Sequence, residues 1–212
     1  MNAMILAAGR GERMRPLTDN CPKPLLKVKG KPLISYHLEA LKKAGITSVV
    51  INVSWLGDQI QLALGDGSAF GLRIQYSVEN DALETAGGII QALDKLDDEF
   101  IVVNGDVFTD YDFSNLLIPT ADAHLVLVPN PEHNPSGDFG IDNGLLLNTS
   151  NQQHTFAGIS CYRKSFFSGL DQGQRALPPL LRAGADQQNV SAELFDGLWN
   201  DVGTAERLEQ LQ

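Results

Sequence analysis

Short apolar segments alternate with segments of helical periodicity along the first 128 residues of the chain. Apolar and β-branched residues predict strands at residues 3–7, 48–53, 72–77, 100–103 and 124–128. Apolar residues spaced three and four apart predict helices at residues 33–44, 56–64 and 85–93. This alternation is typical of βαβ units. We therefore predict an α/β fold with a Rossmann-like, mainly parallel (mixed) sheet and helices on both of its faces.

The alternation weakens after residue 129. Residues 130–153 are rich in Asn, Gly, Pro and Asp, and they predict loops and a hairpin. Beyond them, the pattern predicts a strand at residues 155–162, a helix at 177–183, the end of a strand at 197–201 and a final helix at 205–211. A length of 212 residues suits one domain.

Charge is distributed unevenly along the chain. The first 31 residues carry a net charge of +5, whereas the remaining residues carry −15. The cations surround Gly9 and Gly11, and glycine lets backbone N–H groups approach an anion closely. This stretch therefore predicts a site for a small, highly charged anion. Parallel sheets bind ligands beyond the C-terminal ends of their strands, so the loops after residues 7, 53, 77 and 103 are expected to meet there.

The overall composition excludes several functional classes. A net charge of −10 argues against nucleic acid or an anionic membrane as a partner. No apolar run approaches the roughly 20 residues of a membrane span. The first apolar segment is short and ends in Gly-Arg-Gly, unlike a signal peptide, so we expect a cytoplasmic protein. Cys21 and Cys161 lack the spacing of a zinc site and are expected to be reduced.

The glycine loop does not match the common dinucleotide or triphosphate motifs. Met14 stands where the G-x-G-x-x-G fingerprint needs its third glycine, and no G-K-[ST] follows. Residues 6–18 instead read L-A-A-G-R-G-E-R-M-R-P-L-T, and residues 22–25 read P-K-P-L. These two segments resemble the signature of the sugar-1-phosphate nucleotidylyltransferases. The resemblance covers residues 4–204 and implies one catalytic domain of the nucleotide-diphospho-sugar transferase (GT-A-like) fold. Its nucleotide-binding half is expected at about residues 1–110 and its sugar-binding half at about residues 111–212.

Four charged residues in these and later motifs are expected to act on phosphate. Nucleotidyl transfer depends on positioning and on neutralising charge at the reacting phosphorus. Arg13 can bind two phosphate oxygens, and Lys23, which lies between two prolines, can act as a point charge. The resemblance implies that Asp106 (in V-N-G-D) and Asp201 (in W-N-D-V-G-T) hold a catalytic Mg²⁺, a cation that prefers oxygen ligands. As alternatives, Asp106 would cap the next segment and Asp201 would be a turn residue.

The resemblance also assigns residues to the nucleoside and the sugar. Nucleotide binding is expected at Leu6, Ala7, Ala8, Gly9, Gly11, Glu79 and Gly87. Sugar binding is expected at Asn104, Asp138, Gly140 and Gly158. Glu79 replaces the glutamine that is common in members that transfer uridylyl or thymidylyl groups; a carboxylate accepts a ring N–H but cannot donate a hydrogen bond. Tight packing of a helix on the sheet is an alternative role for Gly87 and Gly88.

Longer segments point to one substrate within the family. Residues 64–68 (L-G-D-G-S), 83–89 (L-E-T-A-G-G-I) and 104–113 (N-G-D-V-F-T-D-Y-D-F) resemble members that transfer a uridylyl group from UTP to N-acetylmuramate 1-phosphate in peptidoglycan recycling. Guanylyl transfer to mannose 1-phosphate and thymidylyl or uridylyl transfer to glucose 1-phosphate are alternatives. A catalytically silent nucleotide-sugar sensor is an alternative of another class.

The anchor for the sugar phosphate is the weakest part of the match. Many relatives have a Glu-Lys-Pro segment, but residues 143–154 of this chain contain no lysine. Arg163 and Lys164 are weak replacements, and His133, like the other histidines, is expected to be satisfied or to face solvent. A cation near the sugar is expected if the substrate carries a lactyl carboxylate. The short chain leaves no room for an acetyltransferase β-helix and little for a dimerisation segment, so a monomer or weak dimer is expected.

Overall fold

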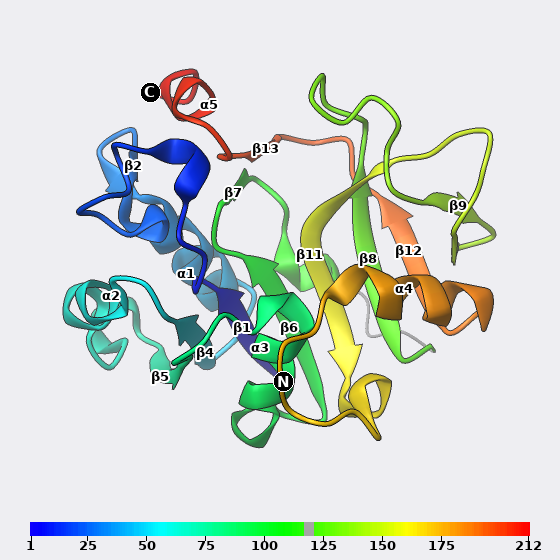
Figure 1. The fold of residues 1–212 in the computed structure, drawn as a ribbon, viewed down its shortest axis with the longest axis horizontal. Coiled ribbons are helices and arrows are strands. Elements are labelled where there is room, and N and C mark those ends of the chain that lie inside the picture. The colour runs from blue at the N-terminus through cyan, green and yellow to red at the C-terminus, as the bar shows by residue number, and fades with distance from the viewer. Residues whose placement is uncertain (117–120) are drawn as a thin grey trace.

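A computed structural model of the protein describes residues 1–116 and 121–212 (Figure 1). Within these residues, nine strands form one central sheet in the order β5-β4-β1-β6-β11-β8-β12-β10-β9. The first four strands are parallel, and they are β5 (Arg73–Val78), β4 (Ser48–Val53), β1 (Asn2–Leu6) and β6 (Glu99–Asn104). Their C-terminal ends therefore share one edge of the sheet, as the sequence predicts.

The rest of the sheet changes direction at β11 (Thr155–Arg163). This strand is antiparallel both to β6 and to β8 (Ala123–Val128), whereas β12 (Val190–Leu194) is parallel to β8. The hairpin of β9 (Gly140–Asp142) and β10 (Leu145–Leu147) forms the far edge. A mixed sheet is thereby confirmed, and so is a hairpin within residues 130–153.

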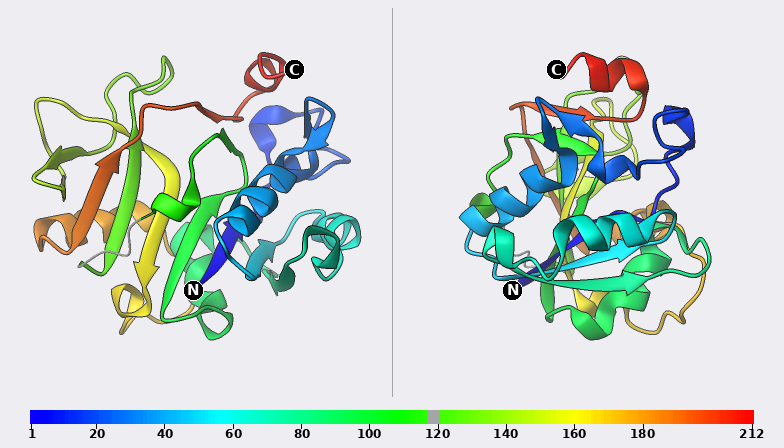
Figure 2. Two further views of the ribbon diagram at one scale, coloured as in Figure 1. Left: turned by 180° about the vertical axis from the view of Figure 1, so that it is seen from behind. Right: turned by 90° about the vertical axis from the view of Figure 1, so that its left-hand side faces the viewer.

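Helices cover both faces of the sheet (Figure 2). Successive strand residues point to opposite faces, and they alternate between two apolar cores. Ala3 and Ile5 pack in the core that contains Ile34 of α1, whereas Met4 packs in the core that contains Ile89 of α3. In the described part of the chain, no helix has both the length and the apolar character that a membrane span requires. The helices around the sheet are α1 (Leu33–Lys43), α2 (Gly57–Leu64), α3 (Glu84–Ala92) and α4 (Leu177–Asp186).

A third apolar cluster joins the two ends of the chain. It packs Met14 of the glycine loop and residues in or next to two short strand pairs against the last helix of the chain. We call it the supporting cluster, and it consists of Met14, Leu26, Val28, Leu33, Phe108, Val202 and Leu208. Val28 belongs to β2 (Lys27–Val28), which pairs with β3 (Lys31–Pro32), and Phe108 belongs to β7 (Val107–Thr109), which pairs with β13 (Trp199–Asp201). Leu33 begins α1, and Leu208 belongs to α5 (Ala205–Glu209).

Candidate active site

A cavity of about 670 Å³ opens beyond the C-terminal ends of the four parallel strands. Each of these strands contributes to it through the loop that follows, with Ala8 after β1, Ser54 after β4, Glu79 after β5 and Gly105 after β6. The prediction that these loops meet at one edge is therefore confirmed. The cavity brings together the following residues that the sequence assigns to the site: Leu6, Ala7, Ala8, Gly9, Gly11, Arg13, Lys23, Glu79, Asn104 and Asp106.

Thr18 holds the glycine loop in shape. Gly11 has a φ of 65°, and a Cβ at this position would lie 2.8 Å from Cγ2 of Thr18. The Thr18 hydroxyl donates to the carbonyl oxygen of Gly11 at 2.8 Å. Met14 is buried in the supporting cluster, whereas Arg13 is exposed and lines the cavity. The loop is thus anchored at two points and presents Arg13 to a ligand.

Lys23 and Asp106 form an ion pair in the cavity wall, with 2.5 Å between Nζ and Oδ2. Lys23 begins a short 3₁₀ turn, Lys23–Leu25. Asp106 follows β6 in a tight turn at Gly105, whose N–H donates to the carbonyl oxygen of Leu6 at 2.9 Å. A Cβ at Gly105 would lie 2.7 Å from that same oxygen, so glycine is needed where the turn passes the end of β1.

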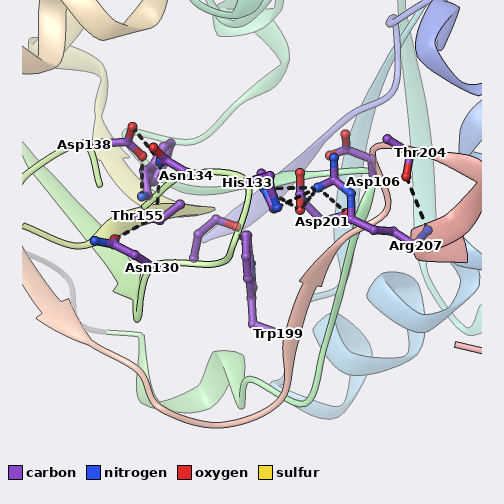
Figure 3. Close-up of polar contacts among 12 residues, drawn as sticks. Asp106, Asn130, His133, Asn134, Asp138, Thr155, Trp199, Asp201, Thr204 and Arg207 are labelled. Carbon is purple, nitrogen blue, oxygen red and sulfur yellow. Dashed lines mark hydrogen bonds and ion pairs between the residues drawn. The ribbon is translucent and has the colours of Figure 1, made fainter. Parts of the chain in front are cut away.

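The β7–β13 pair brings the two predicted metal ligands side by side (Figure 3). Asp201 is opposite Val107, and the N–H of Val202 donates to the carbonyl oxygen of Asp106 at 2.8 Å. The described residues contain no group of three or more His, Cys, Asp or Glu side chains that could hold a metal. Two neighbouring carboxylates nevertheless fit a cation such as Mg²⁺, which binds one or two carboxylates and takes its other ligands from phosphate and water.

Two residues outside the predicted site meet at Asp201 (Figure 3). The Arg207 guanidinium of α5 donates through Nη1 to Oδ1 of Asp201, and the Nε2 atom of His133 lies 3.1 Å from the same oxygen. The His133 ring therefore has polar partners. This agrees with the expectation that each histidine is either hydrogen-bonded or faces solvent. The sequence carries no local signal for either residue, because both lie outside the recognised motifs.

Two buried polar side chains fix the start of the glycine loop. Oδ1 of Asn52 accepts the N–H of Ala7 at 2.8 Å, and Nδ2 of Asn52 donates to Oε1 of Glu79 at 2.7 Å. Burial raises the pKa of Glu79, although its hydrogen bonds with Asn52 and with the backbone of Leu83 oppose this shift. Asn52 was not assigned to the site from the sequence, although a lone amide at the end of an apolar strand is a usable signal.

The two glycines of α3 have different neighbours. A Cβ at Gly88 would lie 2.5 Å from Oε1 of Glu79 and 3.0 Å from Nδ2 of Asn52. A Cβ at Gly87 would overlap the carbonyl oxygen of Gly173, and the Gly87 N–H donates to the carbonyl oxygen of Arg175 at 3.1 Å. Gly87 packs on the segment at residues 173–175 and is absent from the described cavity lining. Gly88 is the glycine that leaves room for the Asn52–Glu79 pair.

Asn104 is the sugar-assigned residue that lines the cavity. Gly158 lies directly behind it on β11, with a φ of 71°. A Cβ at Gly158 would lie 2.5 Å from Nδ2 of Asn104. The absence of a side chain at this position therefore lets the Asn104 amide occupy its place at the end of β6.

The other two sugar-assigned residues are absent from the lining of the described cavity. Oδ2 of Asp138 accepts the backbone N–H of Phe156 at 2.8 Å, which ties the loop after residue 130 to β11. A Cβ at Gly140 would overlap the side chain of Ser150. In this structure both residues shape the loops between β8 and β11.

Arg163 and Lys164 lie at the wrong end of the sheet to replace the missing lysine. Nε of Arg163 is 3.1 Å from Oε1 of Glu99, at the start of β6, and the backbone N–H of Lys164 donates to the carbonyl oxygen of Asp98 at 2.9 Å. Both residues line a second cavity at that end. Asn104 is at the opposite end of β6, so neither cation reaches the cavity that Asn104 lines.

Residues 2–142 match the family model described as nucleotidyl transferase. The chain belongs to the nucleotidyl transferase family. It is 54% identical over 225 residues to the N-acetylmuramate alpha-1-phosphate uridylyltransferase of Neisseria meningitidis serogroup B, an alignment that covers 100% of this chain and 97% of the relative. A mannose-1-phosphate guanylyltransferase of Mycobacterium tuberculosis is 31% identical over 97% of this chain, which spans 62% of that protein's length. These relatives are sugar-1-phosphate nucleotidyltransferases, as the motifs of this family member predict.

The fold of this nucleotidyl transferase is shared with solved structures. A Bacillus anthracis protein described as a glucose-1-phosphate thymidylyltransferase, solved with sucrose, superimposes with a TM-score of 0.87 at 23% identity. The match covers 100% of this chain and 93% of the other. The nucleotide-diphospho-sugar transferase fold is therefore confirmed. Nucleotidyl transferases of this family generally use a divalent metal ion.

Proposed function

We propose that this protein transfers the uridylyl group of UTP to N-acetylmuramate α-1-phosphate, forming UDP-N-acetylmuramate and pyrophosphate. The proposed reaction takes place in the cytoplasm and belongs to peptidoglycan recycling. The observation that carries the proposal is the 54% identity to a uridylyltransferase over the full length of this chain. The geometry supports it, because Arg13, Lys23 and Asp106 line one cavity together with the Glu79 carboxylate.

The proposed reaction is an in-line displacement at the α-phosphorus of UTP. A phosphate oxygen of the acceptor forms the new P–O bond, while the bond between the α-phosphorus and its bridging oxygen breaks and pyrophosphate leaves with the electron pair. A general base is not required, because the attacking phosphate is already anionic. Lys23 neutralises charge at the α-phosphate, and Arg13 binds the departing pyrophosphate.

Asp106 and Asp201 would hold the Mg²⁺ ion. When bound, this cation supplies Lewis-acid neutralisation of phosphate charge. The chain itself compensates both carboxylates, with Lys23 on Asp106 and Arg207 on Asp201. A partly buried carboxylate without such a partner would be costly, and these ion pairs reduce that cost.

Glu79 narrows the choice of nucleotide. Its carboxylate can accept the ring N–H of uracil, thymine or guanine, a donor that adenine and cytosine lack. The backbone of the glycine loop is proposed to surround the same base and its ribose through Leu6, Ala7, Ala8, Gly9 and Gly11. Guanine presents two neighbouring N–H donors to a carboxylate, so guanylyl transfer is the second candidate function.

Pyrophosphate release tests these functions directly. The assay pairs UTP, GTP, dTTP and ATP in turn with N-acetylmuramate α-1-phosphate, mannose 1-phosphate and glucose 1-phosphate. We expect the highest kcat/KM with UTP and N-acetylmuramate α-1-phosphate. A higher value for GTP or for a neutral hexose would reassign the substrate. Binding of UTP without turnover of any acceptor would identify a sensor.

A further inference from the structure

Arg207 lies at the boundary between the nucleotide cavity and the sugar-side loops. Its Nη1 donates to the carboxylate of Asp201 and, at 3.1 Å, to the backbone oxygen of the same residue. A Cβ at Gly203 would lie 2.7 Å from Nη2 of Arg207, and Gly203 lines the nucleotide cavity. The guanidinium therefore packs directly against the cavity wall, at a point where only a glycine leaves room for it.

Most of the Arg207 guanidinium is unused. Every hydrogen bond that its side chain makes with the described residues involves Nη1, so Nε and Nη2 donate to no acceptor there. A guanidinium has five N–H donors, and two parallel donors match the two oxygens of a phosphate or carboxylate. The side chain is 16% exposed, which shields it from water but leaves it accessible. These properties suit an oxyanion-binding group.

The loop at residues 130–138 brings a second polar side chain, the imidazole of His133, to the same place. Nε2 of His133 lies 3.1 Å from Nη1 of Arg207 and 3.1 Å from Oδ1 of Asp201. Hydrogen bonds within the loop and to β11 hold it in position (Figure 3). The side chains that make these bonds are those of Asn130, Asn134, Asp138 and Thr155.

We propose that Arg207 and His133 bind an oxyanion of the acceptor sugar 1-phosphate, namely its phosphate or its lactyl carboxylate. The inference rests on the proposed function. Asp201 contacts both side chains, and it lies opposite Val107 in the β7–β13 pair, next to Asp106, whose own partner is Lys23. The acceptor is an anion and is expected to bind a cation. Residues 143–154 contain no lysine that could serve, and Arg163 lies at the other end of the sheet.

Equilibrium binding separates this role from a purely structural one. Isothermal titration of the acceptor is carried out on the protein loaded with a non-reacting UTP analogue. Arg207→Met is expected to raise the dissociation constant of N-acetylmuramate α-1-phosphate about 10- to 100-fold, since it removes charge-assisted hydrogen bonds. The dissociation constant of the UTP analogue is expected to be unchanged. His133→Ala should weaken acceptor binding in the same direction by a smaller factor.

Arg163→Met is the matched control, because Arg163 also pairs with a carboxylate but lies outside the site. It should leave both dissociation constants unchanged. Arg207→Lys keeps a positive charge next to Asp201 but lacks the two parallel N–H donors of a guanidinium. This variant replaces Arg207→Met in the experiment if Arg207→Met does not fold. Unchanged acceptor binding in both Arg207 variants, or equal weakening of acceptor and UTP analogue, would overturn the proposal.

A second acceptor identifies which oxyanion is bound. N-acetylglucosamine α-1-phosphate has the phosphate but lacks the lactyl carboxylate. If Arg207→Met weakens both acceptors equally, the ligand is the phosphate; if it weakens only the muramic acceptor, the ligand is the carboxylate. A wild-type protein that binds neither acceptor would refute the proposed function and this inference with it. A wild-type protein that binds them as tightly as its Arg207 variants do would refute the inference alone.

Discussion

The side-chain amide of Asn52 donates to Glu79 at 2.7 Å while its oxygen accepts the N–H of Ala7 at 2.8 Å. The backbone N–H of Ala7 can only donate, so it holds the amide oxygen of Asn52 toward Ala7 and turns the NH₂ group toward a carboxylate oxygen of Glu79. Glu79 thus supports the start of the glycine loop through Asn52, and it is also the proposed acceptor for the base.

Replacement of Glu79 by alanine tests this double role. Glu79→Ala removes the acceptor for the base N–H and leaves the Asn52 amide unpaired, so the KM for UTP is expected to rise about tenfold. Initial rates at varied UTP concentration measure the change. Glu99→Ala is the control, since it removes a carboxylate paired with Arg163 at the far end of the sheet. An unchanged KM for UTP would show that Glu79 does not contact the base.

Loss of the Lys23 charge should act on turnover rather than on folding. Lys23→Met is expected to lower kcat about 100- to 1,000-fold, because a preorganised charge at the reacting phosphorus is lost. Lys31→Met is the matched control: its ammonium also pairs with a carboxylate, that of Glu39 at 2.6 Å, but lies outside the cavity lining. Thermal unfolding verifies that both variants are folded. Turnover close to wild type in Lys23→Met would remove this residue from the mechanism.

Stability should fall in weak acid because of His37. Burial lowers the pKa of His37 to about 4, although a hydrogen bond with the backbone of Val107 and the charge of Asp106 oppose the shift. An unfolded histidine has a pKa of about 6.5, so below that pH the unfolded state binds a proton that the folded state excludes. The contribution of His37 is therefore fully present above pH 6.5 and is lost as the pH falls toward 4, by about 3 kcal/mol in total.

Urea unfolding near neutral pH and at about pH 5 measures this loss. His37→Gln has no titrating group and should flatten this part of the stability profile. The same slope in wild type and His37→Gln would assign the acid sensitivity to other residues.

Two glycines with similar φ values, Gly158 and Gly144, allow the effect of backbone strain to be measured separately from an effect on the site. Gly158 and Gly144 have φ values of 71° and 78°, so the backbone strain of an alanine is expected to cost about 1 kcal/mol at either position, and the contact with Asn104 adds to this cost at Gly158. A Cβ at Gly144 would have nothing within 4 Å, whereas one at Gly158 would lie 2.5 Å from Nδ2 of Asn104. Only Gly158→Ala should therefore also reduce kcat/KM for the acceptor. Chemical denaturation and initial rates give the two quantities, and equal activity in both variants would contradict a role for the Asn104 position.

Local periodicity predicts the helices and the strongly apolar central strands, and it misses short strands that have few apolar residues. The helix expected at residues 33–44 is α1 (Leu33–Lys43), because its apolar stripe is strong and Pro32 and Gly45 bound it. The pattern does not predict β12 (Val190–Leu194) or β7 (Val107–Thr109). These short strands are defined by their partners, β8 and β13, which lie far away in the sequence.

The same distinction holds for the site. Arg13 and Lys23 lie in one contiguous motif, so the sequence alone suggests that they act together. Arg207 and His133 are 74 positions apart and meet only because α5 and the loop at residues 130–138 converge on Asp201. No spacing rule connects such residues before the chain is folded.

The supporting cluster has a consequence for the order in which the protein is made. Met14 and Leu26 leave the ribosome early, but the side chains that complete their packing, Val202 and Leu208, are synthesised almost 200 residues later. At bacterial and eukaryotic translation speeds this interval lasts roughly 10 to 40 seconds. The nascent chain therefore carries its glycine loop without the apolar support beneath it for most of its synthesis, and the supporting cluster is complete only when residues 202–208 have been added.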